Sequence, residues 1–181
     1  MSKQQFENFL EFSPEDTARI LKSRAAELAV EDKTILTEQE TIEVVEFLVA
    51  HERYAFELYH IREVCPLKQL THIPGVPDFV LGITNIRGHI ISIIDIKNFF
   101  DLPDKGLTNP NQIVIIKSKE MEFGILADEI VGVKSIPVAT IQDSLATLTG
   151  IRGKYLKGVT AESLVILDGA KFLSDSSLIV C

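Results

Sequence analysis

The sequence has no tryptophan, only two cysteines and no long apolar run. No stretch approaches the roughly 20 apolar residues that a membrane-spanning helix needs. Charged side chains interrupt residues 1–12, where a secretory signal has a continuous apolar segment. Cys65 and Cys181 suit a reducing compartment and form no Cys-x-x-Cys pair, although the sequence leaves a disulfide between them open. We therefore expect a cytoplasmic protein without direct membrane insertion.

Basic residues are also few. Lys and Arg number 18 against 26 Asp and Glu, which gives a formal net charge of −8. A nucleic-acid partner is not expected, because its phosphates need a basic surface. Hydrophobic residues make up 46% of the chain and charged residues 24%, the balance of a soluble globular protein. With 181 residues the chain can form one substantial domain or two small ones.

Motifs of catalysis and metal binding are missing as well. His51 and Glu52 begin the pattern of a zinc-protease helix, but Ala55 stands where the second histidine belongs. Residues 150–155 contain a Gly-Lys pair, yet Tyr155 replaces the Ser or Thr of a phosphate-binding loop. We expect no catalytic residue, no metal and no cofactor. A small-ligand-binding regulator stays open on the strength of that one segment.

What the chain does have is an internal repeat. Apolar residues recur in the same order in two copies, and the first matched segment has an offset of 69. The matched segments are 44–47 with 113–116, 79–84 with 155–160, and 94–99 with 167–172. A shared pattern of apolar positions predicts a shared fold unit. Between the last two segments the second copy is three residues shorter, so Arg87 and Gly88 belong to the first copy alone.

Short β-prone runs about 8–12 residues apart, with turn residues between them, indicate a mainly β fold built of small barrels. The expected strands are 44–49, 54–59, 80–86 and 90–96 in the first copy and 113–118, 123–127, 131–136, 155–160 and 164–167 in the second. Residues 60–67 are charged on one side and are expected to form one or two helical turns. We expect a domain over 41–181 with copies at about 41–100 and 111–175, a seam over 97–111, and two barrels that share a core.

Residues 1–40 differ from the rest and are expected to form a helical extension and a linker. Ser13 can cap a helix, and Pro14 fits the first helical position. The helix would carry one apolar stripe, made of Ile20, Leu21, Ala25, Leu28 and Ala29. Two interpretations of this stripe remain open: it packs on the β core, or it docks a partner or a second copy.

The Arg87 insertion is the candidate functional element. Gly88 supplies the backbone freedom for a tight bend between two apolar strands, and Arg87 projects a five-donor fork beside it. One interpretation is a plain hairpin with a solvated arginine. The other is an arginine set on rigid strands, where it grips a partner or braces neighbouring loops.

Over about residues 42–180 the chain resembles the CheW family of chemotaxis coupling proteins. The resemblance rests on the ordered blocks 61–64 (Ile-Arg-Glu-Val), 73–77 (Ile-Pro-Gly-Val-Pro), 82–88 (Gly-Ile-Thr-Asn-Ile-Arg-Gly), 93–96 (Ile-Ile-Asp-Ile) and 155–159 (Tyr-Leu-Lys-Gly-Val). It implies two intertwined five-stranded SH3-like β-barrels and a non-catalytic adaptor. Such an adaptor joins a CheA-type histidine kinase to the cytoplasmic tips of chemoreceptors. The resemblance also implies partner contacts at Ile61, Glu63, Val64, Gly82, Asn85, Arg87 and Gly88.

The sequence departs from the family pattern in three places. Ser92 occupies a position where the family commonly has proline, Cys65-Pro66 is unusual after the Ile-Arg-Glu-Val block, and the first 40 residues lie outside the resemblance. These departures leave an alternative open. The chain would then be a CheW-like adaptor of a different kinase array, such as one that controls surface motility.

Overall fold

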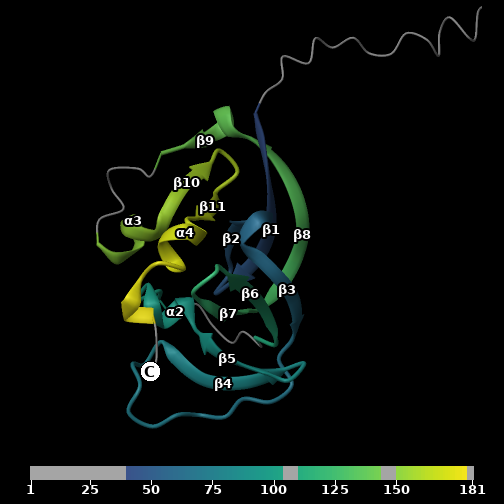
Figure 1. Ribbon diagram of the computed structural model, residues 1–181. Coiled ribbons are helices and arrows are strands. Elements are labelled where there is room, and N and C mark those ends of the chain that lie inside the picture. Colours follow the sequence, from purple (N-terminus) through teal and green to yellow (C-terminus); the bar gives the residue numbers. More distant parts are fainter. Residues whose placement is uncertain (1–39, 104–109, 144–149, 179–181) are drawn as a thin grey trace, which may run out of the picture. The chain divides into compact units, whose positions relative to one another are not determined.

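The computed structural model describes residues 40–103, 110–143 and 150–178 (Figure 1). The helical extension expected at the start of the chain lies outside the described residues. Within the described ranges strands dominate, and each α-helix is a short turn of four or five residues. The structure therefore confirms the mainly β fold class.

Two sheets contain the strands. The six-stranded sheet has the order β8-β1-β2-β11-β10-β9, and the five-stranded sheet has the order β3-β6-β7-β5-β4. The bounds are β1 Thr41–Val49, β2 Glu52–Glu57, β3 Ile61–Pro66, β4 Val80–Ile86, β5 His89–Ile94, β6 Gln112–Lys117, β7 Glu122–Ala127, β8 Glu129–Pro137, β9 Ile141–Gln142, β10 Leu156–Thr160 and β11 Leu164–Leu167. Because β9 is only two residues long, each barrel keeps five main strands.

The two copies exchange their first hairpins. β1 and β2 of the first copy lie in the six-stranded sheet with β8 to β11 of the second, and β6 and β7 of the second copy lie with β3 to β5 of the first. Parallel pairing of β2 with β11 and of β5 with β7 joins the copies on one side of each exchanged hairpin. Antiparallel pairing of β1 with β8 and of β6 with β3 joins them on the other side. The expectation of intertwined barrels is confirmed.

Strand β6 shows why the repeat contains a continuous apolar run. Its central residues, Ile113 to Ile116, are all fully buried. Because side chains alternate along a strand, Val114 and Ile116 face a core shared by both sheets, while Ile113 and Ile115 face the interior of the five-stranded barrel. A strand buried on both faces reads as an unbroken apolar segment.

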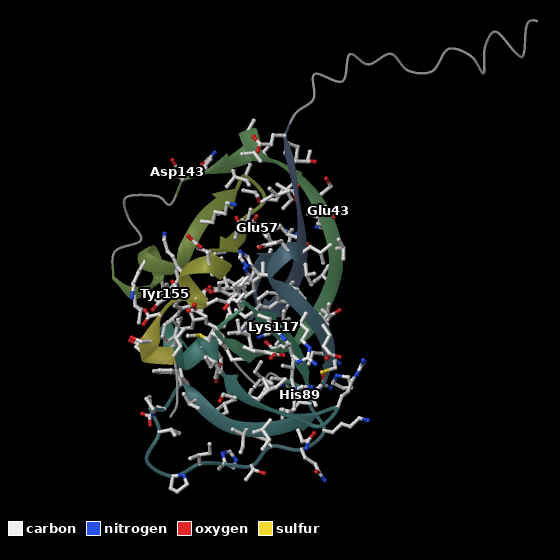
Figure 2. All side chains as sticks on the ribbon, viewed as in Figure 1. Glu43, Glu57, His89, Lys117, Asp143 and Tyr155 are labelled. Atoms are coloured by element: carbon white, nitrogen blue, oxygen red, sulfur yellow. The ribbon has the colours of Figure 1, made fainter. Side chains whose placement is uncertain are left out.

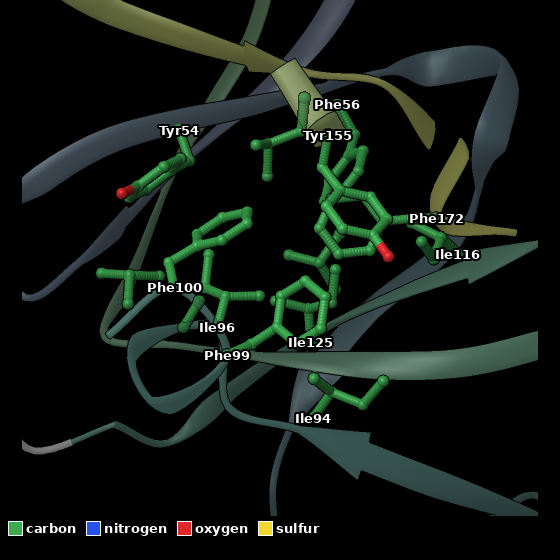
Figure 3. Close-up of a cluster of buried hydrophobic side chains, with 14 of the residues drawn as sticks. Tyr54, Phe56, Ile94, Ile96, Phe99, Phe100, Ile116, Ile125, Tyr155 and Phe172 are labelled. Atoms are coloured by element: carbon green, nitrogen blue, oxygen red, sulfur yellow. The ribbon is translucent and has the colours of Figure 1, made fainter. Parts of the chain in front are cut away.

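The shared core is rich in aromatic side chains from both copies (Figure 3). Phe56 belongs to the first copy and Phe172 to the second, and their ring centroids lie 5.5 Å apart with the rings edge to face. Tyr155 packs still closer on Phe172, with centroids 4.6 Å apart. Aromatic pairs at such separations add stabilisation beyond their buried area. The core therefore holds the two barrels together as one unit.

Two short helices deliver part of that core. α2 (Ile96–Phe99) and α4 (Gly169–Phe172) occupy matching places in the two copies. Asp95 accepts a hydrogen bond from the Lys97 amide at 2.8 Å, and Asp168 accepts one from the Lys171 amide at 3.0 Å. These aspartates cap the helix starts. The repeated Asp and the Phe four residues later thus encode a capped turn that aims a phenylalanine into the core.

The expectation of helical turns over residues 60–67 was wrong for most of that range. A single 3₁₀ turn, η2, spans Leu58–His60, and β3 follows directly. The charges that argued against a strand are held in ion pairs: Arg62 bonds Glu122 of β7, which comes from the other copy. A cross-strand charge pair stabilises a sheet, so β3 tolerates a charged pattern.

The exchange predicts that neither copy folds alone. Cutting the chain between residues 105 and 106, within the seam, should give two fragments that are insoluble or unfolded when expressed separately. Each sheet would lack the two strands that the other copy supplies. Co-expression of both fragments should restore a folded complex with a cooperative thermal transition by circular dichroism. Two separately stable, cooperatively unfolding fragments would contradict the exchange.

Candidate functional site

Three of the expected site residues form one tight turn between β4 and β5. Arg87 and Gly88 are its two central residues, with φ angles of 52° and 87°. Positive φ at both positions is the geometry of a type I′ hairpin turn. Asn85 reinforces the turn, because its side-chain oxygen accepts a hydrogen bond from the Gly88 amide at 2.8 Å. The insertion unique to the first copy is therefore a rigid corner.

Glu63 anchors this corner to β3. Its carboxylate lies 3.1 Å from the Arg87 guanidinium, with the Arg87 side chain 79% exposed and the Glu63 side chain 16% exposed. A pair open to solvent on one side contributes little to stability. The guanidinium has five donors and this one pair uses few of them. We call Glu63, Asn85, Arg87 and Gly88 the Arg87 corner.

A chain of ion pairs continues from Glu63 across the sheet. Arg62 lies 3.6 Å from Glu63 through its Nε atom, and it also pairs with Glu122. Glu122 lies 3.4 Å from Lys117. Burial raises the pKa of Glu122, but Arg62 and Lys117 outweigh burial and hold that pKa below its usual range. Figure 2 labels Lys117, where this chain ends, and His89, which follows the Arg87 turn.

A hollow of about 510 Å³ lies beside the corner. Its lining includes Glu63, Cys65, Lys68 and Arg87, which place two cations around one carboxylate. Burial raises the pKa of the Cys65 thiol, which disfavours the reactive thiolate. The hollow is suited to holding a partner's carboxylate beside apolar contacts rather than to nucleophilic chemistry.

The other expected site residues have different environments. Ile61 is partly buried against the shared core, and Val64 is 36% exposed on β3. Gly82 is buried with φ at +143°, and a Cβ atom there would lie 2.2 Å from the carbonyl oxygen of Thr71. The segment at Thr71 bridges to Ile83 through two backbone hydrogen bonds. Gly82 is therefore required by the fold, and the Arg87 corner brings together four of the seven expected site residues.

Three features of the surface escaped the sequence reasoning. Arg62 connects Glu63 to β7, which only the strand exchange brings near. Ile90, three residues after Arg87, is 72% exposed. Val131 and Val133 are 48% and 59% exposed on β8, the third strand of the second copy. The repeat pattern gave no sign that Ile90, Val131 and Val133 are exposed, because they are as apolar as the buried residues of the same strands.

The Gly-Lys segment does not present free cations. Its residues form α3 (Ile151–Tyr155). Lys154 lies 2.5 Å from Asp175 and Arg152 donates to the Phe100 carbonyl at 3.2 Å. Lys154 and the Tyr155 hydroxyl together hold the pKa of Asp175 well below its usual range. These contacts tie the end of the second copy to the core.

Within the described residues, no group of three or more His, Cys, Asp and Glu side chains is arranged to hold a metal ion. In the same part of the chain, no helix has the length and apolar character to cross a membrane. A rigid β scaffold that presents a charged corner on a tight turn is typical of a protein-interaction module.

Residues 43–177 match the family of CheW-like domains, and the chain belongs to the CheW family. It is 28% identical over 165 residues to the chemotaxis protein CheW of Treponema pallidum. That alignment covers 87% of this chain and 93% of the other protein. Protein PilI of Pseudomonas aeruginosa is 26% identical over 99 residues, 55% of this chain and 56% of that protein. The crystal structure of the scaffolding protein TtCheW from Thermoanaerobacter tengcongensis has a TM-score of 0.62 at 27% identity and covers 71% of this chain and 84% of that one.

Gly82, on β4 before the corner, and Gly88, within it, should respond differently to an added methyl group. Gly82→Ala should lower the free energy of unfolding by about 3 kcal/mol or more, because the added Cβ meets the Thr71 backbone. Gly88→Ala is the matched control: its φ is also positive, but nothing lies within 4 Å of the added Cβ. There the loss should be about 1–2 kcal/mol from backbone strain alone. Urea unfolding measures both. Equal losses would mean that Thr71 does not pack against Gly82.

Proposed function

We propose that this protein is a non-catalytic adaptor that couples a CheA-type histidine kinase to the cytoplasmic tips of chemoreceptors. Family membership and the likeness to a scaffolding protein support this proposal. The observation that carries it is the Arg87 corner, where an exposed arginine stands on a rigid turn that the second copy lacks.

The corner can recognise a partner by charge and shape together. The Arg87 fork can bind a carboxylate with two parallel hydrogen bonds, a geometry that lysine cannot reproduce. Exposed Val64 and Ile90 offer apolar contacts. Because the type I′ turn and Glu63 already restrict the arginine, less conformational freedom is lost on binding. Binding at such a preorganised corner is the step by which the adaptor would link its partners.

A second candidate is an adaptor of the same kind in a different kinase array. The likeness to protein PilI favours it, since that relative carries a different name from the chemotaxis proteins. The two candidates share a mechanism and differ only in which kinase and receptor are bound. Binding of the purified protein to each kinase of the native cell, compared side by side, separates them.

Arg87→Ala should weaken binding to kinase or receptor fragments by about 1–3 kcal/mol, the usual loss for a charge-assisted contact. Its effect on stability should be smaller, because the side chain is largely exposed. Lys157→Ala is a control from the other barrel: it removes an ion pair with Glu57 at 2.5 Å and should leave binding unchanged. Isothermal titration calorimetry, with urea unfolding of each variant, measures these effects.

A further variant separates gripping a partner from bracing a loop. Glu63→Gln removes the charge that holds Arg87 but leaves its guanidinium free to meet a partner. We expect a smaller loss of binding than for Arg87→Ala. An equal loss would make Arg87 a brace, and unchanged binding of Arg87→Ala to every fragment would contradict this placement of the site.

A further inference from the structure

A second hollow is lined by residues of both copies, none of which lines the hollow beside the Arg87 corner. It measures about 740 Å³ and is formed by η2, the turn between β6 and β7, and α4. Its lining includes Tyr59, His60, Lys117, Lys119 and Leu173. None of these side chains belongs to the Arg87 corner, although Lys117 ends the chain of ion pairs that starts at Glu63. We call it the Tyr59 hollow.

Tyr59 is largely exposed and lies outside the buried core of the fold. Its side chain is 89% exposed, and η2 contains no buried residue and has no side-chain cap. The matching position in the second copy, at the offset of 69, is Asp128. Asp128 accepts a hydrogen bond from the Ala50 amide at 2.8 Å, so the same position there serves the fold. In the first copy it carries a large amphipathic ring facing solvent instead.

Packing on a neighbouring side chain restricts the Tyr59 ring. Tyr59 packs edge to face on His60 with centroids 5.0 Å apart. His60 in turn lies directly on α4, because a Cβ atom at Gly169 would come within 2.5 Å of the His60 ring. A tyrosine restricted in this way loses little freedom on binding, which is why tyrosine is common at the centres of interfaces.

The lining of the hollow has two lysines and one glutamate, an excess of basic side chains in a protein of net charge −8. Lys117 is 52% exposed and shares Glu122 with Arg62. Lys119 is exposed and has no ion pair among the described residues. Glu120 is the one acidic residue in the lining. A local positive field of this kind attracts a partner of opposite sign.

We propose that the Tyr59 hollow is a second docking surface, one that takes an acidic segment of a partner protein. An apolar side chain of that segment packs on the Tyr59 ring, and its carboxylates pair with Lys117 and Lys119. The surface differs in chemistry from the Arg87 corner, which presents a single forked cation on a tight turn. The protein can therefore hold two different partner segments at once, one on the Arg87 corner of the first copy and one on elements of both copies.

The test uses the full-length ¹⁵N-labelled protein and a short synthetic peptide in which glutamate alternates with leucine. Titration should shift the amide signals of residues 117–120 and 170–174. Tyr59→Ala and Lys119→Glu should each weaken the affinity for the peptide by at least about fivefold. Ile90→Ala and Lys68→Glu are matched controls beside the Arg87 corner and should leave peptide affinity unchanged.

Three results would overturn the proposal. The same peptide with glutamine in place of glutamate could bind equally well, which would remove the role of charge. The signals could shift elsewhere, or not at all, which would remove the hollow. The same signals could shift with protein concentration alone, which would make the occupant a second copy of this chain. A failure of Arg87→Ala to affect kinase or receptor binding would leave this test untouched.

Discussion

The exchange of first hairpins between the two copies is the constraint on which the rest of the structure depends. Each exchanged hairpin is joined to the opposite copy on both sides, in parallel by one strand and in antiparallel by the other. The aromatic rings of the shared core come from both copies and close the space that the exchange creates. Because neither barrel is complete alone, the two barrels form one rigid body. That rigidity is what allows the surface of an adaptor to present residues in fixed positions.

Each sheet contains an arginine that pairs with a glutamate beside a hairpin turn, and the two arginines differ in exposure. In the six-stranded sheet, Arg53 lies 2.5 Å from the almost fully buried Glu46 and donates to the Glu162 carbonyl at 3.2 Å, which ties the β10–β11 turn to the sheet. The hydrogen bond from Arg53 outweighs burial and lowers the pKa of Glu46. In the five-stranded sheet the arginine stands on the turn itself, as Arg87, and is 79% exposed. An arginine that pairs with a glutamate is thus largely open to a partner in the five-stranded sheet, whereas Arg53 in the six-stranded sheet is only 32% exposed.

The sequence was informative where the pattern is local. The repeat predicted two intertwined units, and the three-residue difference between the copies located the corner at Arg87. It misled where partners come from far along the chain: β3 is a strand because it pairs with β6 of the other copy, and Arg62 meets Glu122 there. The sequence also gave no sign that Gly82 is required by the close approach of Thr71. The Tyr59 hollow draws its lining from three segments separated by about fifty residues each, so no motif could reveal it.

The central claim is that this protein bridges two partners without chemistry of its own. Analytical ultracentrifugation of a receptor signalling fragment and the regulatory part of its kinase, with and without this protein, tests that claim most directly. We predict that this protein binds each partner separately, and that kinase and receptor form one complex only when the protein is present. A complex of kinase and receptor that is unchanged by the protein, or binding to neither partner, would contradict the account.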